Sequence, residues 1–413
     1  MARTLRAACH LWIMLAVLGF GWALSTVTGT DLLTDSAAYP VTVSLLLAVG
    51  LYGSTSGIDL AEARDDLRTL LLAVTVGVLA KAALIVPVLW FAVREPAYLI
   101  LAIAVAQIDP LSVAALRSRS RMSERGKTVL SVWSSFDDPV TVLLTAYLAP
   151  VALSALNGAK DSSALPVTPD AYAFTMLGNV ALVAMAGLAW FLLRPRPRTQ
   201  RWGDGKAALL RASVSLLVLG GVLVAATAYG LMLGVAIVGL FYRPPLLLPV
   251  IGPVLTTAYY LALVALGLLL VDGVEPGPGI ALGAAAFGAQ MVVGWLIARN
   301  LDRSDRVSLA LGQQNGVTAV VLALSLQPAF PRTVAIVAPA VVTVNVVHFL
   351  TNELWNRRQL TRSAPSPPSG VGSGVRLAAA DGPSPPVTPG SGPPLGVMCD
   401  QIPRLAPEDL ADP

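Results

Sequence analysis

Twelve apolar segments, most of them long enough to cross a lipid bilayer as a helix, dominate this sequence. A transmembrane helix needs about 20 apolar residues, because it rises about 1.5 Å per residue. The segments are 10–28, 40–57, 68–93, 97–116, 128–150, 171–193, 207–228, 230–243, 249–271, 279–298, 306–327 and 332–351. The range 230–243 is short for a crossing. We therefore expect an all-α integral membrane protein with about 12 transmembrane helices.

The composition agrees with a chain surrounded by lipid. Hydrophobic residues make up 55% of the sequence and charged residues 13%, whereas a soluble domain carries about 25% charged residues. The net charge of +4 does not indicate a nucleic-acid partner, since the basic residues lie between apolar segments. Cys9 and Cys399 are far apart and have no metal-binding spacing. We expect no cofactor and no nucleic-acid partner.

The distribution of basic residues predicts the orientation of the chain in the membrane. With the amino terminus in the cytoplasm, 22 Arg and Lys residues lie in cytoplasmic segments and three, Arg94, Lys160 and Arg332, in outer ones. This alternation predicts that both termini are cytoplasmic. The bias towards Arg over Lys is typical of a high-GC bacterial coding sequence, so we expect a bacterial cell membrane. A signal peptide cleaved at Ala23-Leu24-Ser25 is the alternative for the first segment, but we expect a membrane span there because more spans follow.

The chain divides into two regions of different composition. Residues 1–360 hold the apolar segments and are predicted to form one transmembrane domain. Residues 361–413 are rich in Pro, Gly and Ser, with 12 prolines from Pro365 to Pro413. Such a composition cannot bury an apolar core. We expect a disordered cytoplasmic tail.

Four charged residues lie near the middle of predicted spans: Lys81, Asp109, Asp137 and Asp138. Each charge inside a bilayer costs about 2.5–3.5 kcal/mol on insertion scales and usually marks a functional position. The helical rise places all four at depths of roughly 10–20 Å. We interpret them as parts of one site.

Two of these positions are followed by proline. In Asp109-Pro110, the proline removes a backbone donor in mid-span, which indicates either a broken helix with a carboxylate at the break or a plain kink. In Asp137-Asp138-Pro139, adjacent helical side chains point about 100° apart, so one carboxylate can bind an ion while the other pairs with a cation. Burial disfavours the charged form of a carboxylate. Such a group holds either a proton or a small cation, and this competition is sufficient for cation–proton exchange.

The eleventh segment contains a polar run, Gly312-Gln313-Gln314-Asn315-Gly316. Flanking glycines weaken the helix, and the side chains of Gln313, Gln314 and Asn315 offer neutral ion ligands. Interruptions in corresponding helices of two halves are typical of an inverted-repeat transporter and its binding site. Helix packing through small residues is the simpler alternative. His348, near the end of the last span, is interpreted as an interfacial residue.

These motifs resemble those of the monovalent cation:proton antiporter superfamily. Ile108-Asp109-Pro110 resembles the Thr-Asp-Pro motif of its unwound fourth helix, with Ile108 in place of threonine, and Asp137-Asp138 is similar to the acid pair of its fifth helix. The stretch from Gly57-Ile58-Asp59-Leu60 to Leu67-Arg68 resembles the segment that enters the third helix. The resemblance covers roughly residues 40–350. It implies inverted repeats with discontinuous helices 4 and 11, and a homodimer.

The resemblance also implies a role for each acid. Asp138 would carry the cation, Na⁺ or K⁺, or the proton, and Asp109 would line the same site. An acidic Asp137 is similar to the electrogenic branch of the superfamily, whose tenth helix carries a lysine that pairs with this acid. Here the tenth span offers Gln290, and Asn315-Gly316 stands in place of the Arg-Gly of the electroneutral branch. We therefore expect Lys81 to pair with Asp137.

Two other functions are compatible with parts of the pattern. A sodium-coupled symporter of the bile-acid type would use Gln314 and Asn315 as sodium ligands but leaves Asp137-Asp138 unexplained. An intramembrane aspartyl protease would use two membrane aspartates, but the sequence has no Gly-x-Gly-Asp motif. We expect a secondary transporter rather than an enzyme.

Overall fold

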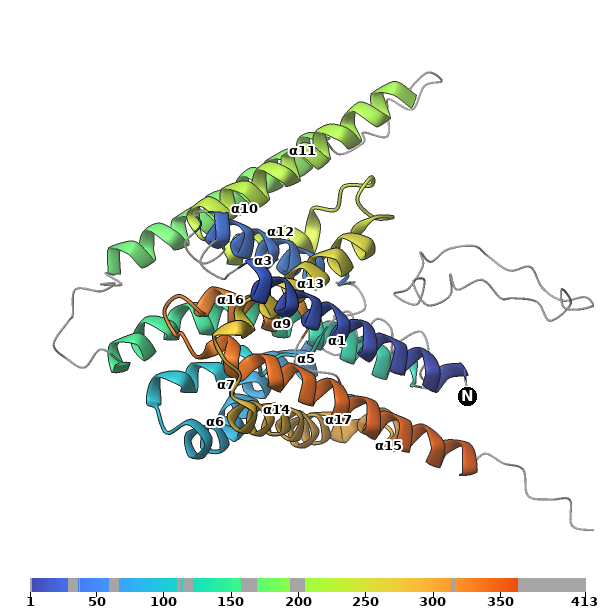
Figure 1. Cartoon of the computed structure of the whole chain (residues 1–413). Coiled ribbons are helices and arrows are strands. Elements are labelled where there is room, and N and C mark those ends of the chain that lie inside the picture. Colours follow the sequence, from blue (N-terminus) through green and yellow to red (C-terminus); the bar gives the residue numbers. More distant parts are fainter. Residues whose placement is uncertain are drawn as a thin grey trace, which may run out of the picture.

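The computed structural model describes residues 2–28, 36, 38–58, 67–109, 113, 122–156, 169–193, 205–312 and 316–362. Nearly all of the described residues are helical (Figure 1). The elements are α1 (Ala2–Thr28), α3 (Ala38–Ser56), α5 (Leu67–Leu72), η1 (Ala73–Gly77), α6 (Val78–Val93), η2 (Pro96–Leu99), α7 (Ile100–Ala104), α9 (Glu124–Leu156), α10 (Pro169–Leu193), α11 (Gly205–Tyr229), α12 (Met232–Phe241), α13 (Ile251–Leu268), η5 (Leu269–Asp272), α14 (Pro276–Ile297), η6 (Ala298–Asn300), α15 (Arg303–Ala310), α16 (Val317–Leu326) and α17 (Thr333–Arg362).

These helices confirm the predicted all-α membrane fold. Eight of the described helices are long and apolar enough to cross a membrane, and the shorter stretches 11–27, 232–241 and 317–326 are also apolar. The short eighth segment is the ten-residue helix α12. The last helix is longer than predicted and continues to Arg362. Most of the proline-rich tail, residues 363–413, lies outside the described residues.

The predicted interruptions of the fourth and eleventh helices are both present. The fourth consists of η2 and α7 and leaves helical geometry after Ala104, so that residues 105–109 are not helical. The eleventh is divided into α15, which ends at Ala310, and α16, which begins at Val317. The third helix also changes geometry, because η1 is a π-helical turn just before α6. Pro110 lies outside the described residues.

The half-helix α16 of the interrupted eleventh helix lies near the centre of the molecule (Figure 1). α10 and α11 lie at one edge of the molecule and α6 and α14 at the opposite edge, with α9 and α16 between them (Figure 1). α14 packs along α17 and α6, α3 packs along α12, and α1 packs along α13. The last crossing depends on small residues, since a Cβ on Gly21 would lie 2.4 Å from the carbonyl oxygen of Val264. Close approach through small residues is typical of membrane helices.

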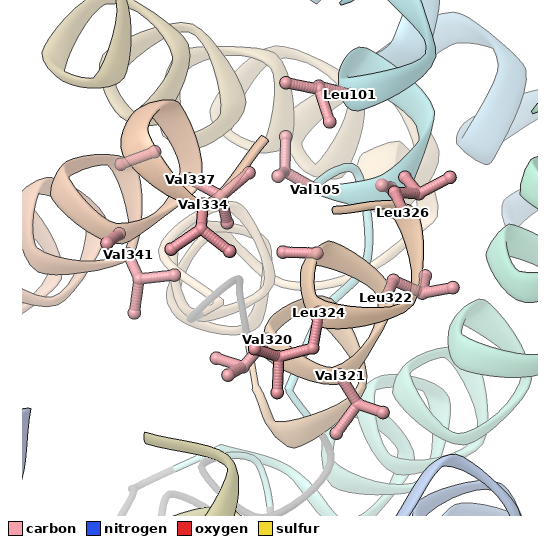
Figure 2. Close-up of a cluster of buried hydrophobic side chains, with 14 of the residues drawn as sticks. Leu101, Val105, Val320, Val321, Leu322, Leu324, Leu326, Val334, Val337 and Val341 are labelled. Atoms are coloured by element: carbon pink, nitrogen blue, oxygen red, sulfur yellow. The ribbon is translucent and has the colours of Figure 1, made fainter. Parts of the chain in front are cut away.

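An apolar core surrounds the inner half-helix α16. Leu101 and Val105 from the fourth helix approach side chains of α16, and valines of α17 complete the cluster (Figure 2). Val320, Val321 and Leu324 are fully buried there. This packing fixes the half-helices next to each other and so positions the polar residues at their ends.

Candidate functional site

The two adjacent aspartates lie in the middle of α9 and are removed from solvent. The exposed fraction is 0% for Asp137 and 1% for Asp138. Both belong to a helix that is apolar on either side of them. A buried charge is tolerated when it is paired or hydrogen-bonded, and the two aspartates meet this requirement in different ways.

Asp137 is bound to a lysine. The Lys81 ammonium lies 2.5 Å from Oδ2 of Asp137, and both side chains are 0% exposed. The backbone N–H of Ile108 donates to the same oxygen at 2.9 Å. The contact expected between Lys81 and Asp137 is therefore present, and it connects the third helix to the fifth. The amide of Ile108 adds the non-helical end of the fourth helix to this pair.

Asp138 is bound by hydroxyl groups. Ser54 on α3 and Thr318 on α16 each donate to Oδ2 of Asp138 at 2.8 Å. Thr318 lies in the first turn of α16, where the positive end of the helix dipole favours a nearby carboxylate. No ion pair to Asp138 is found among the described residues. Its hydrogen-bond partners are neutral hydroxyl groups, which can donate to a carboxylate or coordinate a cation.

Asp109 lies where the two interrupted helices meet. Its side chain is 6% exposed. Gly316, the residue before α16, lies against the Asp109 side chain: a Cβ at position 316 would be 2.1 Å from Oδ1 of Asp109. Any side chain at position 316 would collide with this carboxylate. The glycine thus permits the break of the eleventh helix to contact the break of the fourth.

A further pair of polar side chains supports this region. The Thr141 hydroxyl donates to Oε1 of Gln107 at 2.7 Å, and Gln107 donates to the Ala104 carbonyl at 3.3 Å. The carbonyl of Ala104 belongs to the last turn of α7, where no helical amide follows to bind it. Gln107 therefore stabilises the end of the half-helix and fixes it to α9.

The carbonyl groups at the end of α15 are also bound by side chains. Gln290 on α14 donates to the Leu309 carbonyl at 3.0 Å. His348 Nδ1 lies 3.0 Å from the Leu311 carbonyl. Gln290 thus binds the break of the eleventh helix, and Lys81 approaches Asp137 from the third helix instead. His348, interpreted from sequence as an interfacial residue, is half-buried against this break.

Four polar residues in this region were not predicted: Ser54, Gln107, Thr141 and Thr318. Ser54, Thr141 and Thr318 are hydroxyl residues in apolar helices, where many such residues only bond their own helix carbonyls, as Thr343 does with Pro339. Gln107 is a neutral residue in the non-helical stretch after α7. Predicting them requires knowing which helices are neighbours. The predicted residues Gln313, Gln314 and Asn315 lie outside the described residues, as does Asp59.

Comparison with known proteins identifies the fold. No protein-family model matches the sequence, and no curated protein matches it. Among solved structures, the chain is similar to the sodium proton antiporter MjNhaP1 from Methanocaldococcus jannaschii, with a TM-score of 0.53 and 16% sequence identity. The match covers 83% of this chain and 91% of that one. Together with the two crossing breaks, this likeness shows that the chain has the fold of a sodium/proton antiporter.

Proposed function

We propose that this protein is a secondary antiporter that exchanges a monovalent cation, Na⁺ or K⁺, for protons. The observation that carries the proposal is the environment of Asp138: it is 1% exposed and bound by two hydroxyls. Asp138 also lies in α9, beside the interruptions of the fourth and eleventh helices. The antiporter fold supports the same function.

The proposed mechanism is a competition for one carboxylate. When Asp138 is ionised, its oxygens and the hydroxyl oxygens of Ser54 and Thr318 can coordinate a cation, after the hydroxyls rotate. When Asp138 is protonated, its charge is neutralised without a cation. Either state removes the cost of an uncompensated buried charge, so each ligand displaces the other. Asp109 would line the same site from the fourth helix.

Lys81 and Asp137 have a separate role in this proposal. Their mutual contact neutralises both charges and leaves Asp138 as the acid that exchanges ligands. The expectation of an electrogenic type rests on Asp137 being acidic. The lysine that pairs with Asp137 comes from the third helix, so the charge carried per transport cycle is a quantity to measure.

The protein would function in a membrane with its breaks near the middle of the bilayer. We propose a bacterial cell membrane with both termini in the cytoplasm, as the distribution of Arg and Lys indicates. A homodimer is proposed from the family resemblance.

Proton flux in proteoliposomes tests the proposal. Purified protein is reconstituted with a pH-sensitive dye inside the vesicles, and NaCl, KCl, LiCl or choline chloride is added outside. We expect the internal pH to rise with Na⁺ or K⁺ and not with choline. A response equal to that of protein-free vesicles for all three metal ions would contradict the proposal.

A further inference from the structure

The face of α9 that carries Asp138 stays polar beyond this acid. Towards the carboxyl end of the helix, the buried polar side chains described after Asp138 are Thr141 and Thr145, which are 0% and 2% exposed. Thr145 is also the last buried position described in α9, since residues 146–153 are all at least partly exposed. It follows Asp138 by nearly two helical turns, so it lies on the same face about 10 Å further along the axis.

The two threonines differ in their hydrogen bonds. The Thr141 hydroxyl donates to Oε1 of Gln107 and so belongs to the polar group beside the break of the fourth helix. The Thr145 hydroxyl is buried without a hydrogen-bond partner among the described residues. A helical threonine can bind a carbonyl of its own preceding turn, as Thr256 does with Gly252, but Thr145 does not make this bond.

The place of this hydroxyl in the fold sets it apart from others in the same condition. Among the described residues, the buried hydroxyls of Ser25 and Thr333 also lack partners, but they lie in α1 and at the start of α17. Thr145 lies on the face of Asp138. A valine has nearly the same shape and would pack there without the cost of burying an unpaired hydroxyl. The Thr145 hydroxyl therefore lowers stability in this conformation.

We propose that Thr145 is a relay ligand, which binds the cation between Asp138 and the outer side of the membrane when this end of the site opens. This inference rests on the proposed function and on the proposed orientation of the chain. The chemistry of a hydroxyl fits the role. Its oxygen can coordinate Na⁺ or K⁺, and because it carries no charge it holds the ion weakly enough to release it, as an ion path requires.

The position of Thr145 also assigns the path to one side of the membrane. The amino end of α9 follows the basic stretch from Arg117 to Lys127, which is expected to lie in the cytoplasm. The part of α9 beyond Asp138 then leads to the outer side. Since Thr141 and Thr145 are both buried, the path is closed in this structure. Loss of the Thr145 hydroxyl should therefore weaken cation entry from the outer side and not from the inner side.

Thiol labelling tests whether this face opens to the outer side. In a Cys9→Ser/Cys399→Ser background, cells carrying Thr145→Cys are treated with a membrane-impermeant, cationic thiosulfonate reagent. Leu101→Cys is the matched control, because Leu101 is 0% exposed and packs in the apolar cluster around α16 (Figure 2). We expect position 145 to be modified much faster than position 101. Equal rates, or modification of position 145 from the inner side alone in everted vesicles, would overturn the proposal.

Transport separates a ligand from a packing role. In right-side-out and everted vesicles, we expect Thr145→Val to raise the KM for Na⁺ or K⁺ about fivefold at the outer side and to leave the inner KM unchanged. Its thermal unfolding temperature should equal or exceed that of the wild type, because an unpaired hydroxyl is removed. Thr145→Ser should restore the outer KM. Thr343→Val, which loses a hydroxyl bound to the Pro339 carbonyl, should change neither KM.

The two proposals fail in different ways. An unchanged outer KM in Thr145→Val, or equal changes at both sides, would overturn the role of Thr145 while the wild type still exchanged cations for protons. If the wild type moved no protons, the proposed function would fail, and labelling of Thr145→Cys would still decide whether this face of α9 opens to the outer side.

Discussion

Asp137 and Asp138 are neighbours on one helix and equally buried, yet their charges are balanced by different means. Asp137 contacts a lysine and a backbone amide. Asp138 receives two hydroxyl groups, one from α3 and one from the half-helix α16. A lysine fixes a carboxylate in its charged form, whereas hydroxyls can serve the charged carboxylate, its protonated form or a bound cation. The difference supports our proposal that Asp138 exchanges ligands while Asp137 has a structural role.

The largest difference between the two acids should be in transport itself. Asp138→Asn removes the charge that a cation needs and the group that a proton occupies. We expect cation-dependent proton flux in proteoliposomes to fall to the level of protein-free vesicles, with normal expression and gel-filtration behaviour. Substantial exchange by this variant would show that another acid carries the ligand.

The next difference should be in stability. Removing one member of a buried ion pair leaves the other charge uncompensated, which typically costs about 3–5 kcal/mol. Lys81→Met and Asp137→Leu should each lower the thermal unfolding temperature in detergent, and the double variant should recover much of the loss. Arg357→Gln is a control, because Arg357 is 69% exposed in its pair with Glu353 and solvent-exposed pairs contribute about 0–1 kcal/mol. Additive losses in the double variant would show that Lys81 and Asp137 do not act as a pair.

Smaller effects are expected at the hydroxyls around Asp138. Ser54→Ala and Thr318→Val each remove one hydroxyl that we propose binds the cation. We expect each loss to cost about 1 kcal/mol, or roughly fivefold in the apparent affinity for the cation. Thr343→Val serves as a control, since its hydroxyl bonds the Pro339 carbonyl of its own helix. Equal apparent affinities for the cation in all three variants would show that the hydroxyls of Ser54 and Thr318 do not bind it.

The smallest effect is expected at the outer ends of the helices, where charges are partly solvated. Arg332 binds Glu275 at 2.6 Å and also contacts Glu95, with 27–43% of these side chains exposed. These hydrogen bonds from Arg332 hold the pKa of Glu275 below its ordinary value of 4.5. A carboxyl whose pKa is lowered by folding stabilises the protein above its ordinary pKa and loses that contribution as the pH falls through the lowered pKa.

Arg332→Gln should therefore reduce stability at neutral pH by about 1 kcal/mol or less, because solvent screens the pair. The difference from the wild type should shrink below about pH 4. Thermal unfolding at several pH values measures this. A difference that stays constant down to pH 3 would mean that packing of the Arg332 stem, rather than its charge, is responsible.

The sequence was sufficient for features that depend on the bilayer. Long apolar segments, the interruptions at Asp109 and near Gly316, and charges in mid-span each carry a physical cost that only a few structures can balance. The Lys81–Asp137 contact followed from the same argument, because each buried charge needs an opposite one. Ser54 and Thr318 could not be predicted, since a hydroxyl in a helix costs little and usually bonds its own backbone. Their role depends on which helices cross near Asp138.

Proton release on cation binding tests most directly whether the two ligands compete for Asp138. NaCl or KCl is added to purified protein in weakly buffered detergent solution near the midpoint of the pH profile, and the released protons are measured with a pH dye. We expect release in the wild type and in the double variant Lys81→Met/Asp137→Leu, and none in Asp138→Asn. Undiminished release from Asp138→Asn would contradict the account.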